Sequence, residues 1–158
     1  MPMPRRAFVA TPLAFIVAGP AWSHHGWSSF DQDRPLYIEG RAVKVVWRNP
    51  HGELELELPE KLSLPPDLKQ RALPKQSADV DGSALLAKAQ LPTRKDRKWQ
   101  VELAPLTRLQ AWGVEEIRPG TQVGVLGFTH AGEKGEAVMR AEYLFVGGKS
   151  YGLRSAPA

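Results

Sequence analysis

The chain has 158 residues, of which 42% are hydrophobic and 24% charged, and it contains no cysteine. This composition is that of a globular protein, the length suits one domain rather than two, and the lack of cysteine excludes disulfides, thiolate metal sites and cysteine nucleophiles. The formal net charge of +4 is too small and too scattered to predict nucleic-acid binding.

Residues 1–23 have the layout of an export signal. Arg5 and Arg6 form a short basic region, residues 7–18 are almost entirely apolar, and Gly19-Pro20 then breaks any helix. The apolar run is too short to span a membrane, which takes about 20 residues. The start PRRAFVA partly matches a twin-arginine signal, so that route and the general secretory route both stay open. We therefore predict a bacterial protein that is periplasmic or secreted, with no membrane span in the mature chain.

Two cleavage sites follow the small-x-small rule. Ala21-Trp22-Ser23 predicts cleavage before His24, and Gly19-Pro20-Ala21 predicts cleavage before Trp22. The second would place a proline beside the scissile bond, so we expect the first. The mature chain then keeps 19 of the 21 basic residues against 17 acidic ones, a net charge of about +2.

Two strands joined by a turn are predicted next. Residues 36–47 are β-branched and alternating, and their parity changes at Gly40, which indicates a β-bulge there. Residues 49–52, Asn-Pro-His-Gly, have the composition of a turn. Residues 53–58 read ELELEL, which predicts a buried face of leucines and a solvent face of glutamates. The glutamates of that solvent face are Glu53, Glu55 and Glu57.

Residues 59–97 interrupt the strand pattern. They contain five prolines, scattered charge and one short helical stretch around residues 83–90. We predict a long loop insertion that is mobile in part and whose basic residues offer a contact surface.

Strand periodicity returns at residues 98–103. A short helix is predicted over residues 104–112, and two more strands over residues 122–130 and 137–146. Residues 147–158 are polar and are predicted to form a flexible tail. The predicted core consists of the inward-facing residues Val45, Trp47, Leu54, Leu56, Trp99, Val101, Leu109, Val123 and Val125.

This order of elements, with a short helix between the third and fourth strands, is that of a five-stranded OB-type barrel. Closing the sheet also removes the edges that so small a domain would otherwise expose. We therefore predict an all-β domain of small α content over residues 24–146, although a small β-sandwich has a compatible order.

Several short motifs follow one another along the chain: His24-His25-Gly26-Trp27, Phe30-Asp31, Trp47-Arg48-Asn49-Pro50-His51, Trp99, Ala111-Trp112-Gly113 and Pro119-Gly120. Together they resemble a family of small exported bacterial proteins known only as a domain of unknown function. Its members begin His-His-Ser-Phe after the signal and carry a Trp-x-Asn-Pro-His motif. Here Gly26-Trp27 replaces Ser-Phe, and the insertion at residues 59–97 is longer than usual, which weakens any partner surface carried over from the family. The resemblance implies a layout and a compartment, not a reaction.

The four histidines are His24, His25, His51 and His130. If His24 is the mature N-terminus, its α-amine and imidazole can close a chelate ring on a metal, and losing the amine proton at neutral pH costs about 1 kcal/mol. A third imidazole completes a T-shaped set of three nitrogens, the histidine brace, and such a set favours copper. We predict His51 as the third ligand because it lies at the turn between the first two strands, with His25 as a further candidate and His130 as a weaker one. Cleavage before Trp22 would place His24 third from the amine, an arrangement that also binds Cu(II) or Ni(II).

Other chemistries fit the sequence less well. The histidines can alternatively be loop residues, and zinc sites are usually completed by carboxylates or cysteines. No nucleophile elbow, phosphate loop or dinucleotide fingerprint is present, so the sequence favours a binding protein over an enzyme. Two functions remain. One is a periplasmic protein with copper as its cofactor, either a carrier or, if an open metal position reacts with oxygen, a redox enzyme. The other is a metal-free interaction module that contacts a periplasmic protein partner through residues 59–97. Export and the small net charge argue against nucleic acid, although OB-type barrels often bind it.

Overall fold

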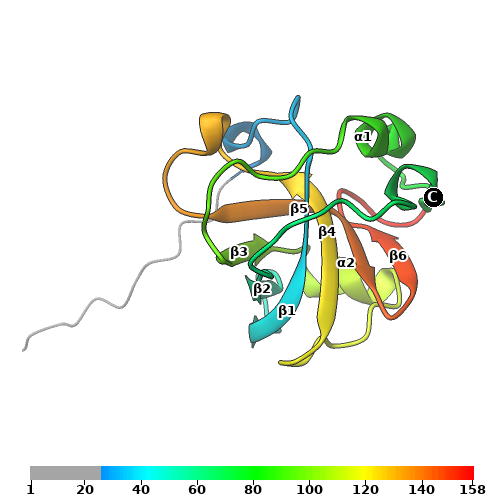
Figure 1. The fold of residues 1–158 in the computed structure, drawn as a ribbon. Helices are drawn as coiled ribbons and strands as arrows, with labels where there is room; N and C mark the ends of the chain where they lie inside the picture. The colour runs from blue at the N-terminus through cyan, green and yellow to red at the C-terminus, as the bar shows by residue number, and fades with distance from the viewer. Residues whose placement is uncertain (1–25) are drawn as a thin grey trace, which may run out of the picture.

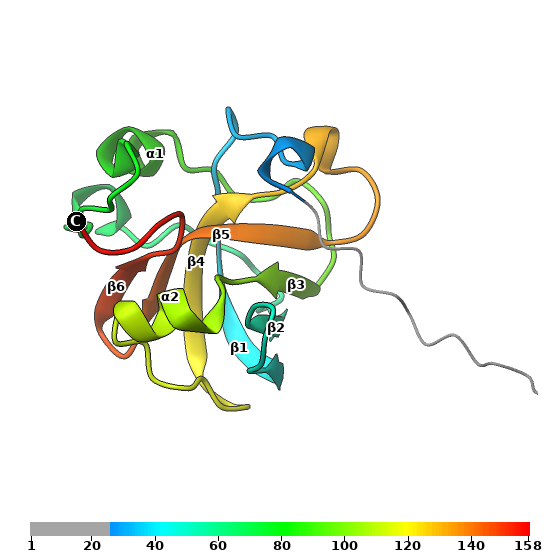
Figure 2. The same cartoon turned by 180° about the vertical axis from the view of Figure 1, so that it is seen from behind.

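A computed structural model describes residues 26–158 of the chain. Within these residues the strands form one sheet around a central core, with the helices on its outside (Figures 1 and 2). The strands are β1 (Leu36–Val46), β2 (Glu53–Glu57), β3 (Lys98–Glu102), β4 (Gln122–Phe128), β5 (Val138–Val146) and β6 (Lys149–Gly152). The helices are α1 (Gly82–Lys88) and α2 (Leu106–Ala111), with the 3-10 helices η1 (Trp27–Ser29), η2 (Leu68–Gln70) and η3 (Ala131–Glu133). None of these helices is long and apolar enough to cross a membrane.

The first five strands close into a barrel. The sheet order is β3-β2-β1-β4-β5-β6, and an additional parallel pairing joins β3 to β5. Strand β6 pairs antiparallel with β5 outside this closed set. Because α2 falls between β3 and β4, the predicted five-stranded barrel with one short helix at that position is confirmed.

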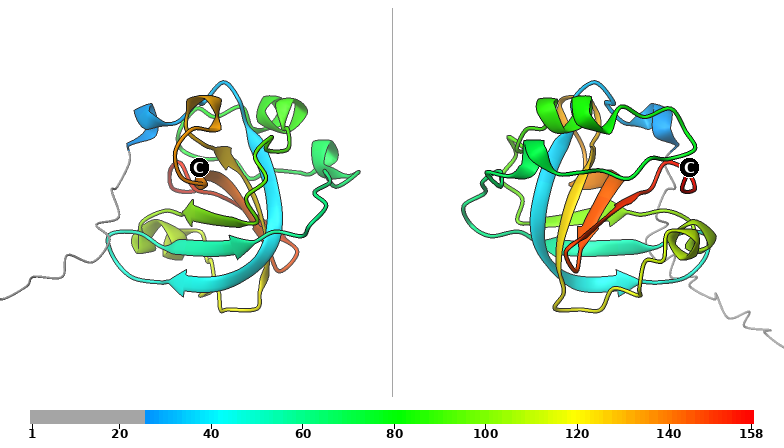
Figure 3. Two further views of the ribbon diagram at one scale, coloured as in Figure 1. Left: turned by 60° about the vertical axis from the view of Figure 1, so that its left-hand side comes forward. Right: turned by 90° about the vertical axis from the view of Figure 1, so that its right-hand side faces the viewer.

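Strand β1 is long and bends around the barrel (Figure 3). Its register on β2 shifts between Ala42 and Lys44, so the predicted bulge exists but lies after Ala42 instead of at Gly40. Gly40 has a different role, because a Cβ there would lie 2.5 Å from the carbonyl oxygen of Glu57. The glycine therefore allows the close approach of β1 to β2.

The barrel interior is filled by the alternating apolar residues of the five strands. All nine predicted core residues belong to this cluster, with Val45 and Trp47 partly buried at its margin. Helix α2 adds the buried Leu109. Gly113 has φ of 67°, and the amides of Gly113 and Val114 bond back to the carbonyls of Gln110 and Leu109. This Schellman arrangement ends the helix at the glycine, as predicted.

The insertion at residues 59–97 differs from the predicted mobile loop. It buries Leu68, Leu86 and Ala89 in a second apolar cluster. The barrel side of that cluster includes Tyr37 and Tyr143. Helix α1, whose N-terminus is capped by Asp81, supplies one of the buried leucines. The insertion is therefore a packed layer on the barrel, which irregular sequence with several prolines did not reveal.

The C-terminal residues also differ from the predicted flexible tail. Residues 149–152 form β6, and Tyr151 and Leu153 are buried. Beyond the strand, the Ser77 amide donates to the carbonyl of Ala156 at 2.9 Å, and the Trp112 indole N–H donates to the carbonyl of Ser155 at 2.8 Å. These bonds fasten the tail to the insertion and to the end of α2.

Candidate functional site

The histidines predicted as metal ligands fall into two groups. His24 and His25 lie outside the described residues, so the amine site predicted there has no described geometry. His51 and His130 lie within them, at different places on the barrel. His51 sits between β1 and β2, and His130 follows β4.

His51 follows a cis Asn49-Pro50 peptide bond in the turn between β1 and β2. Its side chain is buried, and its Nδ1 lies 3.5 Å from a carboxylate oxygen of Glu53, which is buried as well. A carboxylate beside one ring nitrogen is the arrangement that orients an imidazole for a metal on the other nitrogen.

Glu53 begins a row of charged residues on the outer face of three strands. It is the register partner of Glu102 on β3, and Glu102 is the register partner of Arg140 on β5. Arg140 donates to the Glu102 carboxylate at 3.2 Å. Their neighbours Leu54 and Val101 point into the core, so the row points outward. The predicted solvent face is therefore wrong at Glu53, which is only 8% exposed.

Arg108 of α2 extends the positive end of this row. Burial, together with the charge of Arg140, lowers the pKa of Arg108 from its usual value. The Arg108 guanidinium donates to the carbonyl of Leu153 at 3.0 Å. The row thus runs from an imidazole and a carboxylate at one end to two guanidinium groups at the other.

The first described residues pack onto the arginine end of the row. The ring of Trp27 in η1 lies 5.0 Å from the guanidinium carbon of Arg140 and 3.6 Å from that of Arg154. It also meets the Phe128 ring edge-on at 6.4 Å between centroids. Trp27, the fourth residue of the predicted mature chain, therefore lies against the face that carries the charged row.

His130 contacts the N-terminal segment at Ser29 and Phe30. Its position after a strand did not predict these contacts. Its Nδ1 is 3.0 Å from the carbonyl oxygen of Ser29, and its ring stacks on Phe30 with centroids 5.0 Å apart. Figures 1 and 3 show η1 beside η3, which begins directly after His130.

Within residues 26–158, no group of three or more histidine, aspartate or glutamate side chains has the spacing to hold a metal ion. The described part supplies single imidazoles, each with an oxygen acceptor beside Nδ1.

Sequence reasoning did not identify Glu102, Arg140, Glu142 and Arg154 as a connected set. For Glu102, Arg140 and Glu142, the only sequence signal is a charged residue between strongly apolar strand neighbours, and Arg154 lies beyond the end of β6. This pattern also describes an ordinary solvent face. These charged residues differ from a solvent face because Trp27 and the C-terminal segment cover them. Both covering segments are distant from them in sequence.

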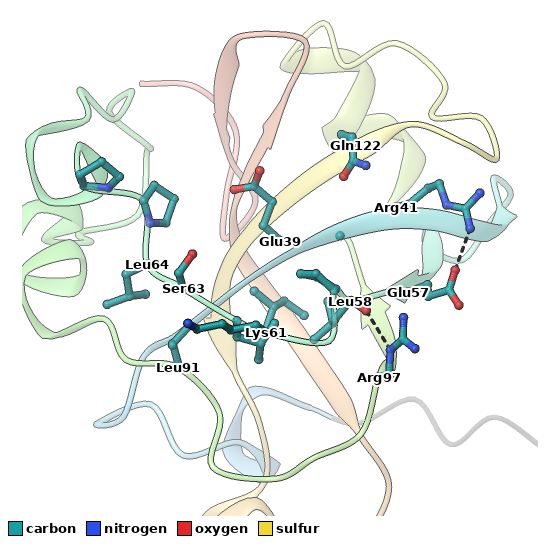
Figure 4. Close-up of a pocket in the computed structure, with 16 residues that line it drawn as sticks. Glu39, Arg41, Glu57, Leu58, Lys61, Ser63, Leu64, Leu91, Arg97 and Gln122 are labelled. Carbon is teal, nitrogen blue, oxygen red and sulfur yellow. Dashed lines mark hydrogen bonds and ion pairs between the residues drawn. The ribbon is translucent and has the colours of Figure 1, made fainter.

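A groove lies on another side of the barrel, between β1 and the start of the insertion (Figure 4). It has a volume of about 490 Å³. Arg41 donates to Glu57 at 2.8 Å along one rim, and Arg97 donates to the carbonyl of Leu58 at 3.3 Å. Lys61 lies across it. Among residues 26–158, neither Lys61 nor Arg97 has a carboxylate within ion-pair distance.

Residues 13–63 match the sequence profile of a family described as a family of unknown function (DUF6152). The matched part contains the N-terminal histidines, β1, the turn with His51, and β2. This similarity supports the resemblance to a domain of unknown function. Neither the comparison with curated proteins nor that with solved structures found a match.

Proposed function

We propose that the protein is exported and binds copper at its mature N-terminus, through the α-amine and imidazole of His24 and the imidazole of His51. Three nitrogens of this kind favour copper among divalent metals. The amine supplies a ligand that no internal residue offers, which makes the site dependent on correct processing.

The observation that carries the proposal is the packing of Trp27 on the face that also carries His51. The backbone positions of Arg140, beneath Trp27, and of Glu53, beside His51, are two strand spacings apart, about 10 Å. His24 lies three positions before Trp27, a covalent reach that is also about 10 Å. This match of lengths supports a shared metal ion between the amine and His51.

The surroundings of His51 support its role as the third ligand. Glu53 lies on the Nδ1 side of the ring, with a carboxylate oxygen 3.5 Å away, so a metal would take Nε2. His130 can be compared with His51, because an oxygen atom, the Ser29 carbonyl, also lies beside its Nδ1.

The test compares four proteins by Cu(II) titration and EPR: the native chain starting at His24, the same chain with a methionine before His24, and the variants His51→Ala and His130→Ala, both with the native start. The extended protein keeps all four imidazoles and should still lose most of its copper affinity, because the chelate ring can no longer close. His51→Ala should weaken binding, while His130→Ala, the matched control, should have little effect. Equal affinity in native and extended proteins would refute the proposal, and a loss confined to His130→Ala would move the third ligand to His130.

A second function is favoured by the groove beside the insertion. There the protein would be a metal-free interaction module that contacts a periplasmic protein through residues 59–97. The cations of Lys61 and Arg97 on the groove suit an acidic segment of the partner. This function would lead if copper binding proved independent of the amine.

A further inference from the structure

Trp27 is partly buried and packs against charged and aromatic groups of the barrel. Arg154 stacks on its ring at 3.6 Å from the centroid, Arg140 lies at 5.0 Å, and Phe128 touches it edge-on. Tryptophan is the side chain with the strongest cation–π attraction. We call Trp27, Arg140 and Arg154 the tryptophan clamp.

The two guanidinium groups of the clamp are fixed independently of Trp27. Arg154 binds the fully buried Glu142 carboxylate through two nitrogens, at 2.8 and 2.6 Å. Arg140 binds the buried Glu102. Because these long side chains are already ordered, the indole docks without the entropy cost of ordering them.

The environment of Arg140 adds a second observation. Its Nε is buried and has no hydrogen-bond partner among residues 26–158, and its side chain is 13% exposed. A guanidinium shielded from water interacts more strongly with an aromatic ring than an exposed one does. The cover of Trp27 is therefore a specific contact and not incidental packing.

We infer that Trp27 is the positioning residue of the amine site: the tryptophan clamp holds the mature N-terminus against the barrel so that the His24 amine meets a barrel imidazole at high effective concentration. The inference rests on the proposed function. It explains how an end of the chain, which usually frays, can supply a metal ligand. A chain end held close to its partner ligand binds as an intramolecular group.

The test is a double-mutant cycle between Trp27 and the free amine. Cu(II) affinity is measured for the wild type and for Trp27→Ala, each with the native His24 start and with a preceding methionine. Trp27→Ala should lower the affinity of the native-start protein about tenfold and change that of the extended protein little. Trp27→Phe keeps an aromatic face and should restore most of the loss.

Trp112→Ala is the matched control, because Trp112 is another partly buried tryptophan with a bond to the C-terminal segment. It should lower the thermal stability without changing the amine dependence of copper binding. A purely structural role of Trp27 would reduce copper affinity equally with both starts, or not at all, and either result would overturn the inference. Equal affinity of native and extended wild type would instead overturn the proposed function and the inference with it.

Discussion

Glu133 joins the end of the insertion to the connection between β4 and β5, and its contribution to stability should depend on pH. Its carboxylate accepts bonds from the backbone amides of Thr93 and Arg94 at 2.9–3.0 Å, and from the Arg34 guanidinium at 2.6 Å. Burial raises the pKa of Glu133, but these hydrogen bonds outweigh it and lower the pKa to about 2.

The replacement Glu133→Gln removes this charge. Glutamine has nearly the same shape as glutamate, so residue 133 can keep its left-handed φ of 53°. A pKa lowered from 4.5 to about 2 corresponds to about 3 kcal/mol, at about 1.4 kcal/mol per pKa unit. Because the folded-state pKa is depressed, this stability is fully present above pH 4.5 and is lost as the pH falls through about 2. The wild type should therefore exceed Glu133→Gln by about 3 kcal/mol at pH 7 and by about 1.4 kcal/mol at pH 3.

Urea unfolding followed by tryptophan fluorescence at pH 7, 5, 4 and 3 measures both proteins. Glu55→Gln is the matched control, because Glu55 pairs with Lys98 at the surface and should contribute less than about 1 kcal/mol. A difference between wild type and Glu133→Gln that stays constant from pH 7 to pH 3 would show that the ionised carboxylate is not the stabilising form. A difference below that of the control would show that the insertion is not fastened there.

Four further outcomes are expected. Leu56→Ala should cost about 2–5 kcal/mol in urea unfolding, since Leu56 is fully buried, and a change below about half a kcal/mol would contradict its inward orientation. Gly40→Ala should cost about 1–3 kcal/mol because its Cβ would meet the Glu57 carbonyl. Gly26→Ala, whose Cβ would make an ordinary contact with the Ser28 hydroxyl at 3.9 Å, should cost less than about half a kcal/mol. Replacing residues 59–97 by a short linker should remove several kcal/mol, at about 1.5–3 kcal/mol per apolar side chain uncovered, and unchanged unfolding would show that the second cluster contributes nothing. Intact-mass analysis of the exported protein should give a chain starting HHGWSSF, and a mass that includes residues 1–22 would remove the basis of the amine site.

The barrel was predictable because its strands alternate in sequence as they do in space. In β2 and β3 every second residue enters the core. This alternation can be recognised from each strand's own sequence, without knowing which segments pack against it. The bulge was predicted at Gly40, three residues before its observed place between Ala42 and Lys44, because a strand glycine has two explanations that sequence cannot separate. A glycine in a strand marks either a bulge or a close backbone approach, and here it is the second.

The insertion and the tail were misjudged for a different physical reason. Leu68 and Leu86 are buried by contact with barrel residues distant in sequence, and a short 3-10 helix has no periodicity long enough to show a buried face. The tail beyond β6 is held by hydrogen bonds to residues 75–78 and to Trp112. Neither kind of contact leaves a repeat in the sequence.

The two ion pairs beside Trp27, Glu102 with Arg140 and Glu142 with Arg154, show the same limit at the candidate site. Buried ion pairs contribute little net stability compared with apolar packing, but breaking one is costly. Glu142 with Arg154 and Glu102 with Arg140 therefore do less to stabilise the barrel than to fix where two guanidinium groups point. An apolar patch in their place would bind any hydrophobic segment in many orientations. Two fixed guanidinium groups accept an aromatic ring in one orientation, and Trp27 is the aromatic residue that the chain brings there from its N-terminal side. A site built on the chain end requires such a fixed direction, because a ligand attached to a freely moving end would seldom meet an imidazole anchored in the barrel.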